Sequence, residues 1–266
     1  MLLSRFIEVM EKIAPTNLKE DFDNVGLMVG DRNKEIKKVL LALDCTDSII
    51  EEAKEIGAQL ILTHHPLIFK KPSSITTDTL QGKKIIKLIQ NDINLYSAHT
   101  NWDSVRAGIN DTIVDMLGFK SDEIIDKNKI DENAGIGRIV TLENTLTLDE
   151  VMDICYKTFG LSGLRYSGDE DKVIKKIAII NGSGQSYFYD AMNKGVDLVI
   201  TGDTSYHMVS DYTEMGMSIL DIGHFKSEWP VLIEVNKKLQ KEIENIGEEI
   251  EFVISKKSED PFKFRM

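Results

Sequence analysis

The sequence predicts an α/β protein built from two similar lobes, and three observations lead to this prediction. Apolar runs typical of buried strands alternate with helical segments along the chain, which indicates βαβ units and a largely parallel sheet. Several segments of the first half recur in the second half in the same order. The chain has 266 residues, enough for one large α/β unit or two smaller lobes with a sizeable core.

The first half predicts a helix, a turn-rich loop, and then strands alternating with helices. We expect a helix at 1–13, a polar loop at 14–31, strands at 37–44, 58–65 and 93–100, helices at 49–56, 82–92 and 109–118, and a loop at 101–108. The run at 37–44 is apolar throughout, as in strands that are buried on both faces. Thr46 can cap the helix that follows this strand, and Gly57 can end it.

The second half repeats this alternation after an acidic connector at 121–135. Thr147 and Glu150 form a capping-box pattern at the start of a helix. We expect strands at 137–142, 175–182, 196–203 and 248–255, and helices at 148–160 and 187–195.

An internal duplication explains the repeated pattern. AKEIGAQLILTHH aligns without a gap on AMNKGVDLVITGD, 138 residues later, and KKVLLALD aligns on KKIAIING at the same offset. YSAHTNWD resembles DIGHFKSE at a slightly different spacing, and both carry a histidine followed by a carboxylate four residues later. We expect a first lobe at 1–120 and a second at 130–266, facing each other across a cleft. The C-terminal helix and strand could instead pack on the first lobe.

Composition limits the classes of function. The net charge of −12 argues against broad binding to nucleic acids or anionic membranes, which clustered Lys and Arg drive. Cys45 and Cys155 are too few for a disulfide framework, and no apolar run is long enough to span a bilayer. We therefore expect a cytoplasmic protein.

The histidines gather where strands are expected to end. They are His64, His65, His99, His207 and His224. In open α/β sheets, ligands bind outside the carboxyl ends of the strands. A single histidine at such a place is usually only a satisfied polar residue, but this shared placement predicts a metal or catalytic cluster.

The residue types favour a pair of divalent metals. Imidazole with carboxylate suits Zn, Mn, Fe, Co or Ni. His224 and Glu228 would share one helix face, whereas His64 and His65 would diverge at a strand end and so serve one ion each. With Asp103 as a fifth ligand, these residues predict a dinuclear centre, with metals about 3.5–4 Å apart. The alternatives are an Asx-turn for Asp103 and a solvated first-turn acid for Glu228.

Two other motifs have competing interpretations. Asp44 could reach the cleft, but a helix-capping role for the Asp44–Thr46 stretch is favoured. The glycine-rich NGSG at 181–184 lacks the lysine and spacing of a P-loop, so a strand-to-helix turn is favoured over a phosphate site.

The ordered motifs HHP, SAHTNWD, GDTSYH and DIGHFKSE, with the earlier loop DFDNVGLMVGD, resemble those of the NIF-three-like family. The motifs extend from residue 22 to residue 228. Members are described as dinuclear-metal-centre hexameric proteins and are known as GTP cyclohydrolase 1 type 2 homologues. Phe22 replaces a tryptophan that many relatives carry, with Asp23 and Asn24 in place. The segment at 119–136 is too short for the extra domain of long-form members.

The resemblance implies two clasped α/β lobes, two divalent metals in the cleft and a homohexamer. The family ligands fall on His64, His65, Asp103, His224 and Glu228. His99 and His207 match the family pattern without being implied ligands. We hypothesise that His99 shuttles protons or supports the ligands, and that His207 faces the substrate.

Two functions from different classes follow. The first is a hydrolase dependent on two metals, acting on a small molecule such as a nucleotide and opening the imidazole ring of GTP in the manner that the family name implies. Phosphoester or amide hydrolysis would use the same centre. The second is a metal-binding or regulatory hexameric scaffold without turnover, and a nucleic-acid-encircling ring is disfavoured by the charge.

Overall fold

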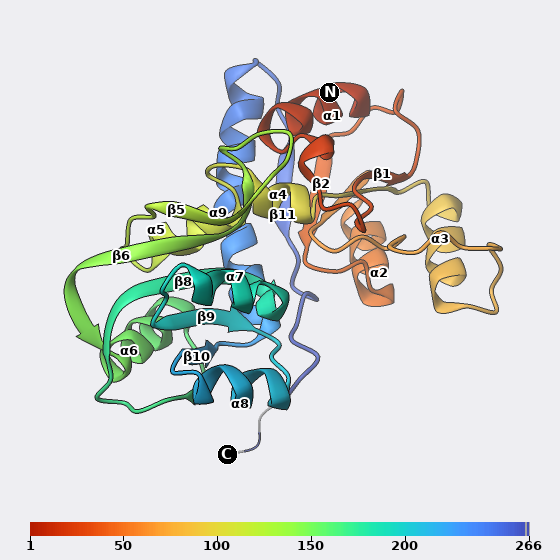
Figure 1. Ribbon diagram of the computed structural model, residues 1–266. Helices are drawn as coiled ribbons and strands as arrows, with labels where there is room; N and C mark the ends of the chain where they lie inside the picture. The colour runs from red at the N-terminus through yellow and green to blue at the C-terminus, as the bar shows by residue number, and fades with distance from the viewer. Residues whose placement is uncertain (264, 266) are drawn as a thin grey trace. The chain divides into compact units, whose positions relative to one another are not determined.

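The computed structural model describes residues 1–263 and 265, which form one five-stranded and one six-stranded sheet. The chain divides into two compact units. Unit 1 comprises Met1–Trp102 with Leu232–Glu259, and unit 2 comprises Asp103–Val231 with Asp260–Met266. The chain leaves unit 1 within α4 (Thr100–Ser104) and returns within α9 (His224–Asn245) (Figure 1). Both units are α/β, as predicted.

Unit 1 contains a mostly parallel sheet in the order β1-β4-β3-β2-β11. Its strands are β1 (Gly26–Val29), β2 (Lys38–Ala42), β3 (Leu60–Thr63), β4 (Asn94–Ser97) and β11 (Glu251–Ile254). Its other elements are α1 (Leu3–Ile13), η1 (Thr16–Leu18), α2 (Asp47–Ile56) and α3 (Leu80–Gln90). Only β1 among these strands runs antiparallel to its neighbour, and β11 pairs in parallel with β2. The C-terminal strand therefore belongs to the first sheet.

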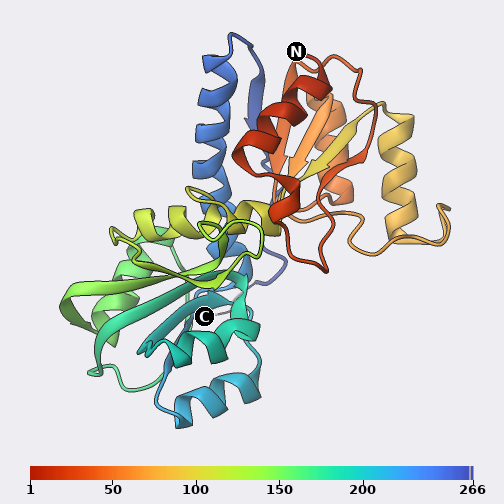
Figure 2. The same cartoon turned by 45° about the horizontal axis from the view of Figure 1, so that its top comes forward.

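Helices cover both faces of this sheet (Figure 2). On one face, Leu40 and Leu95 form a buried cluster with Ile50 of α2 and Leu88 of α3. On the opposite face, the Tyr96 ring meets Phe6 of α1 at a centroid distance of 6.1 Å. The alternation of Leu95 and Tyr96 follows from the two-residue period of a strand.

Unit 2 contains a mixed sheet in the order β5-β6-β8-β9-β10-β7. Its strands are β5 (Glu123–Lys127), β6 (Gly135–Thr147), β7 (Arg165–Ser167), β8 (Val173–Ser183), β9 (Leu198–Gly202) and β10 (Ser218–Asp221). Its remaining elements are α5 (Ile109–Met116), α6 (Leu148–Phe159), η2 (Gly184–Tyr187), α7 (Phe188–Asn193) and α8 (Tyr206–Glu214). Strands β8, β9 and β10 are parallel. β6 pairs antiparallel with β8, β7 pairs antiparallel with β10, and β5 pairs antiparallel with β6.

The predicted helix ends are confirmed at α2 and α6. The Thr46 hydroxyl accepts a hydrogen bond from the Ile49 amide, and Gly57 ends α2 at φ +68°. Thr147 and Glu150 form a complete capping box at α6. Each N-terminal cap contributes about 1 kcal/mol of stability.

The duplication is visible in the strand register. Val39 of β2 pairs with Leu60 of β3, and Ile177 of β8 pairs with Leu198 of β9. Each residue of the second pair lies 138 positions after its counterpart. Strands β2, β3 and β4 of unit 1 therefore correspond to β8, β9 and β10 of unit 2. The residue pairing between β2 and β3 is the same as that between β8 and β9.

Three segments differ from the prediction. The expected loop at 101–108 begins within α4, the acidic connector contains β5, and α8 follows β9. Helix α4 begins where the Thr100 amide donates to the Asp23 carboxylate. A cap supplied from 77 positions away cannot be seen in a local sequence pattern. No helix within residues 1–263 and 265 is long and apolar enough to cross a lipid bilayer.

Candidate metal-binding sites

Three histidines of unit 1 lie together at the carboxyl ends of two neighbouring strands. His64 and His65 follow β3, and His99 follows β4. One ring nitrogen from each histidine lies within 4.8 Å of the others. The centroid distances are 5.3 Å for His64 and His65, 5.1 Å for His64 and His99, and 5.6 Å for His65 and His99. We call these three residues the histidine cluster.

Backbone and carboxylate acceptors fix the tautomers of the first two rings. His64 Nδ1 lies 2.8 Å from the carbonyl oxygen of Ala98, and His65 Nδ1 lies 2.9 Å from Asp44 Oδ1. These oxygens can only accept, so each Nδ1 carries the proton and donates. Each Nε2 then carries the lone pair that a metal ion needs.

His99 faces a buried acid. Its Nδ1 lies 3.0 Å from Asp23 Oδ1. Burial raises the pKa of Asp23, but hydrogen bonds from His99 and Thr100 outweigh this effect and lower the pKa to about 2. Asp23 therefore stays ionised at neutral pH and orients the His99 ring.

The helix-capping role favoured for the Asp44–Thr46 stretch is confirmed at Thr46. Thr46 caps α2, while the Asp44 carboxylate accepts from His65. The contact of Asp44 with His65 was not foreseen, because residues 44 and 65 come together only once β2 and β3 pair. Asp23 was noted in the early loop but not assigned to His99, since their contact spans two separate segments.

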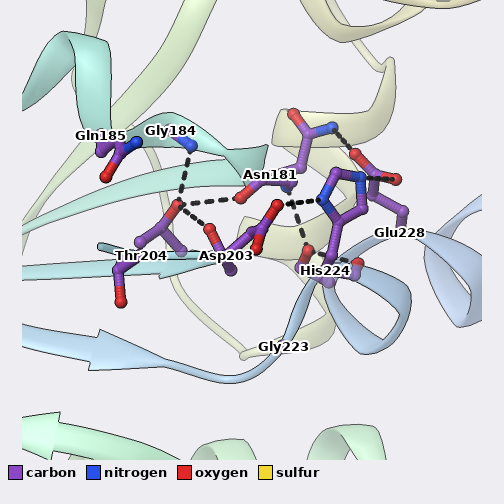
Figure 3. A network of polar contacts seen from close by, with 12 residues as sticks. Asn181, Gly184, Gln185, Asp203, Thr204, Gly223, His224 and Glu228 are labelled. Atoms are coloured by element: carbon purple, nitrogen blue, oxygen red, sulfur yellow. Dashed lines mark hydrogen bonds and ion pairs between the residues drawn. The ribbon is translucent and has the colours of Figure 1, made fainter. Parts of the chain in front are cut away.

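Unit 2 brings His224 and Glu228 together on the first turn of α9. His224 Nε2 lies 3.1 Å from Glu228 Oε2, and His224 Nδ1 lies 3.4 Å from Asp203 Oδ2 (Figure 3). The side chain of Glu228 is buried, with 2% of the residue exposed. This burial excludes the alternative in which Glu228 is a solvated first-turn acid.

Asn181 joins two of the predicted ligands in unit 2. Its side-chain nitrogen donates to Glu228 Oε1 over 3.0 Å (Figure 3). The same nitrogen donates to Asp103 Oδ1 over 3.0 Å. The Asn110 side chain binds the same two residues through their backbones. It donates to the Asp103 carbonyl oxygen and accepts from the Asn181 backbone N–H. Asp103 is 5% exposed and lies in α4 rather than in a surface Asx-turn. Sequence reasoning missed Asn181, which it treated as part of a turn.

Gly182 leaves the room that the Glu228 carboxylate occupies. Its φ of +55° belongs to the left-handed region, and an added Cβ would lie 2.3 Å from Glu228 Oε1. A side chain at this position would therefore displace the carboxylate.

The donors present fit a divalent transition metal. Imidazole nitrogens with carboxylate oxygens suit Zn, Fe, Mn, Co and Ni. His64 and His65 belong to unit 1, and Asp103, His224 and Glu228 to unit 2. His207 lies exposed on the first turn of α8, with its ring 5.3 Å from that of Tyr206, and it is not in a group of three or more His, Cys, Asp or Glu metal-ligand candidates among residues 1–263 and 265.

Comparisons with known proteins agree over the length of the chain. The model of a family described as Duf34/NIF3 (NGG1p interacting factor 3) matches residues 1–261. A Clostridium perfringens protein named GTP cyclohydrolase 1 type 2 homolog is 61% identical over 264 residues, covering 99% of this chain and all of the relative. A Clostridium acetobutylicum protein of the same name is 53% identical, covering 97% and 96%. The crystal structure of Staphylococcus aureus protein SA1388 superimposes with a TM-score of 0.91 at 30% identity, covering 100% and 99%.

Proposed function

The chain belongs to the Duf34/NIF3 family, and from this premise we propose that it is a hydrolase dependent on divalent metal ions. The predicted ligands are His64, His65, Asp103, His224 and Glu228, and the proposed stoichiometry is two ions per chain. Divalent ions, when bound, lower the pKa of a coordinated water and neutralise anionic oxygens of a substrate.

The histidine cluster of unit 1 carries this proposal. Its three ring nitrogens lie within 4.8 Å of one another, and each Nδ1 faces an oxygen acceptor. Histidines that bind metals in proteins commonly donate their other ring hydrogen to a carboxylate or carbonyl. The acceptors beside His64 and His65 therefore support a metal-binding role for these two residues.

The chain's own side chains set the charge and the proton donors of the proposed site. Asp103 and Glu228 share the Asn181 side-chain amide as a hydrogen-bond donor. His99, oriented by Asp23, and the exposed His207 are the candidate donors of a proton to a leaving group.

GTP is the first substrate to test, because the two clostridial relatives are named GTP cyclohydrolase 1 type 2 homolog. Opening the imidazole ring adds hydroxide at the carbon between the two ring nitrogens and breaks one carbon–nitrogen bond. The departing nitrogen takes up a proton. Phosphoesters and amides belong in the same screen, since the proposed ligands do not select among these bonds.

Metal content per chain is the decisive measurement, made on protein purified without chelator. We expect about two divalent ions per chain in the wild type and the loss of one ion in His64→Ala and in His65→Ala. Glu228→Gln should abolish turnover while the fold is retained. His207→Ala is the matched control and should keep the metal content of the wild type.

Two results would contradict this function. Absence of bound metal, with no uptake of Mn, Fe, Co or Zn, would exclude the metal-dependent mechanism. Two metals per chain without turnover on any substrate of the screen would favour the scaffold function instead.

A further inference from the structure

Two exposed phenylalanine rings of unit 1 lie beside the histidine cluster. Phe22 is 63% exposed and Phe69 is 43% exposed. Their ring centroids are 6.2 Å apart, and the Phe69 ring lies 6.4 Å from that of His99 at a near-perpendicular angle. Single exposed apolar side chains are common, but a pair adjoining a polar cluster calls for a specific explanation.

The backbone on either side of the two rings is held in place. The Asn24 side chain donates to the carbonyl oxygen of Ile68 over 2.5 Å, which ties the loop of Phe22 to the segment of Phe69. The Asp23 carboxylate accepts from the amide and hydroxyl of Thr100. The two rings are therefore exposed on anchored segments, and little conformational entropy would be lost when a ligand contacts them.

We propose that Phe22 and Phe69 form a stacking platform for a planar heteroaromatic ring of the substrate. The inference rests on the proposed function in taking the histidine cluster as part of the reacting site. The 57° tilt between the two rings and their contact leave no slot between them, so the ligand ring stacks on their outer face. A ring on this platform adjoins the His99 side, where a proton donor is proposed. The platform supplies the base recognition for which the sequence contains no motif.

The size of the pair fits a small ligand better than a protein. A phenylalanine side chain buries about 150–250 Å², so the two partly exposed rings offer less than about 400 Å². A stable protein interface needs about 800 Å² from each partner. Two adjacent rings match the extent of one fused heterocycle, and such heterocycles stack favourably on aromatic side chains.

The test compares GMP and AMP with ribose 5-phosphate, which has the same sugar and phosphate but no base. Binding is measured by calorimetry on the full chain, with metal and with chelator. The wild type should bind both nucleotides more tightly than ribose 5-phosphate. The double variant Phe22→Leu/Phe69→Leu keeps apolar side chains but loses the rings, and it should bind the nucleotides about fivefold or more weakly with ribose 5-phosphate unchanged. Phe22→Trp keeps an aromatic ring and should keep the preference for nucleotides over ribose 5-phosphate. Ile89→Ala, which changes an exposed residue of α3, should not alter this preference.

Each outcome decides the matter. Equal binding of nucleotides and ribose 5-phosphate by the wild type, or an unchanged preference in the double leucine variant, would overturn the platform. A change in the mass of the assembly in this variant would reassign the rings to contacts between chains. Metal content is measured on the same samples. A base preference in protein that binds no metal under any condition would contradict the proposed hydrolase but not the platform. Metal-dependent turnover without a base preference would contradict the platform but not the proposed hydrolase.

Discussion

Asn181 donates a hydrogen bond from its side-chain amide to the buried carboxylate of Glu228, over 3.0 Å. The same nitrogen donates to Asp103 over 3.0 Å. One neutral side chain therefore separates two acids that would otherwise repel each other in a site with little solvent. This relationship, which sequence reasoning missed, gives the first prediction.

Asn181→Asp would replace this shared donor with a third acid. In the presence of a chelator, we expect the free energy of unfolding to fall by about 1–3 kcal/mol, because two charged acceptors lose their donor. Urea unfolding measures this loss. Asn193→Asp adds the same charge at an exposed position of α7 and should have little effect. Equal stability of Asn181→Asp and the wild type would contradict the assigned role of Asn181.

Asp44→Ala should weaken metal binding by about 10–100-fold, because the Asp44 carboxylate orients His65 and holds its Nδ1 proton. The number of ions bound at saturating metal should stay the same, which distinguishes a supporting residue from a ligand. Competition with a chelating dye measures the affinity. Asp47→Ala, which removes the neighbouring acid paired with Lys87, is the control and should bind metal as the wild type does.

Gly182→Ala should lower metal binding through a clash, and Gly195→Ala separates this effect from backbone strain. Both glycines have positive φ, +55° and +70°, so alanine at either should cost about 1–2 kcal/mol of stability. Only at Gly182 would the new Cβ meet Glu228, since nothing lies within 4 Å at Gly195. Metal analysis should show a loss in the first variant alone. Equal losses in both would mean that strain, and not the clash, disturbs the site.

Acid should destabilise the metal-free protein partly through Asp221. Burial raises the pKa of this group, but hydrogen bonds from Thr204 and Gly223 and the charge of Arg165 outweigh it and hold the pKa below 3.8. A lowered folded-state pKa stabilises the protein above the unfolded value, and this stability is lost as the pH falls through the folded pKa. Asp221→Asn should therefore be less stable than wild type at about pH 6, with the difference shrinking towards about pH 3.

Thermal unfolding across this pH range, with chelator present, measures the Asp221 effect. Asp211→Asn removes an exposed acid of α8 and should leave the pH dependence near that of the wild type. A constant difference between Asp221→Asn and wild type at every pH would show that lost packing, and not ionisation, accounts for the change.

Local patterns predicted the parts of the fold that local interactions determine. The apolar runs of β2 and β3, the cap at Thr46 and the capping box at Thr147 depend on residues a few positions apart, and all were found as expected. Strand β5 and helix α4 were not predicted, and α4 depends on a partner 77 positions away. β5 pairs with β6, and α4 begins at the Asp23 carboxylate. No local period indicates either element.

In the candidate site, too, local patterns predicted some residues, and contacts between separate segments determine the others. The histidines were recognisable because rare residues recur at strand ends, and Glu228 because it lies four positions after His224. Asn181, Asp44 and Asp23 act through contacts spanning 47, 21 and 76 positions. Such contacts depend on the pairing of strands. The divergence predicted for His64 and His65 was overestimated, because β3 ends at Thr63 and the strand alternation ends with it.

The pairing of β11 with β2 sets an order of events during synthesis. Residues 38–42 leave the ribosome long before residues 251–254, so one edge of β2 stays unpaired while residues 103–231 of unit 2 are made. Because an exposed strand edge is a template for wrong pairing and domains tend to fold as they emerge, unit 2 can complete its sheet first. Unit 1, which contains the histidine cluster, therefore completes its sheet after unit 2 has completed its own.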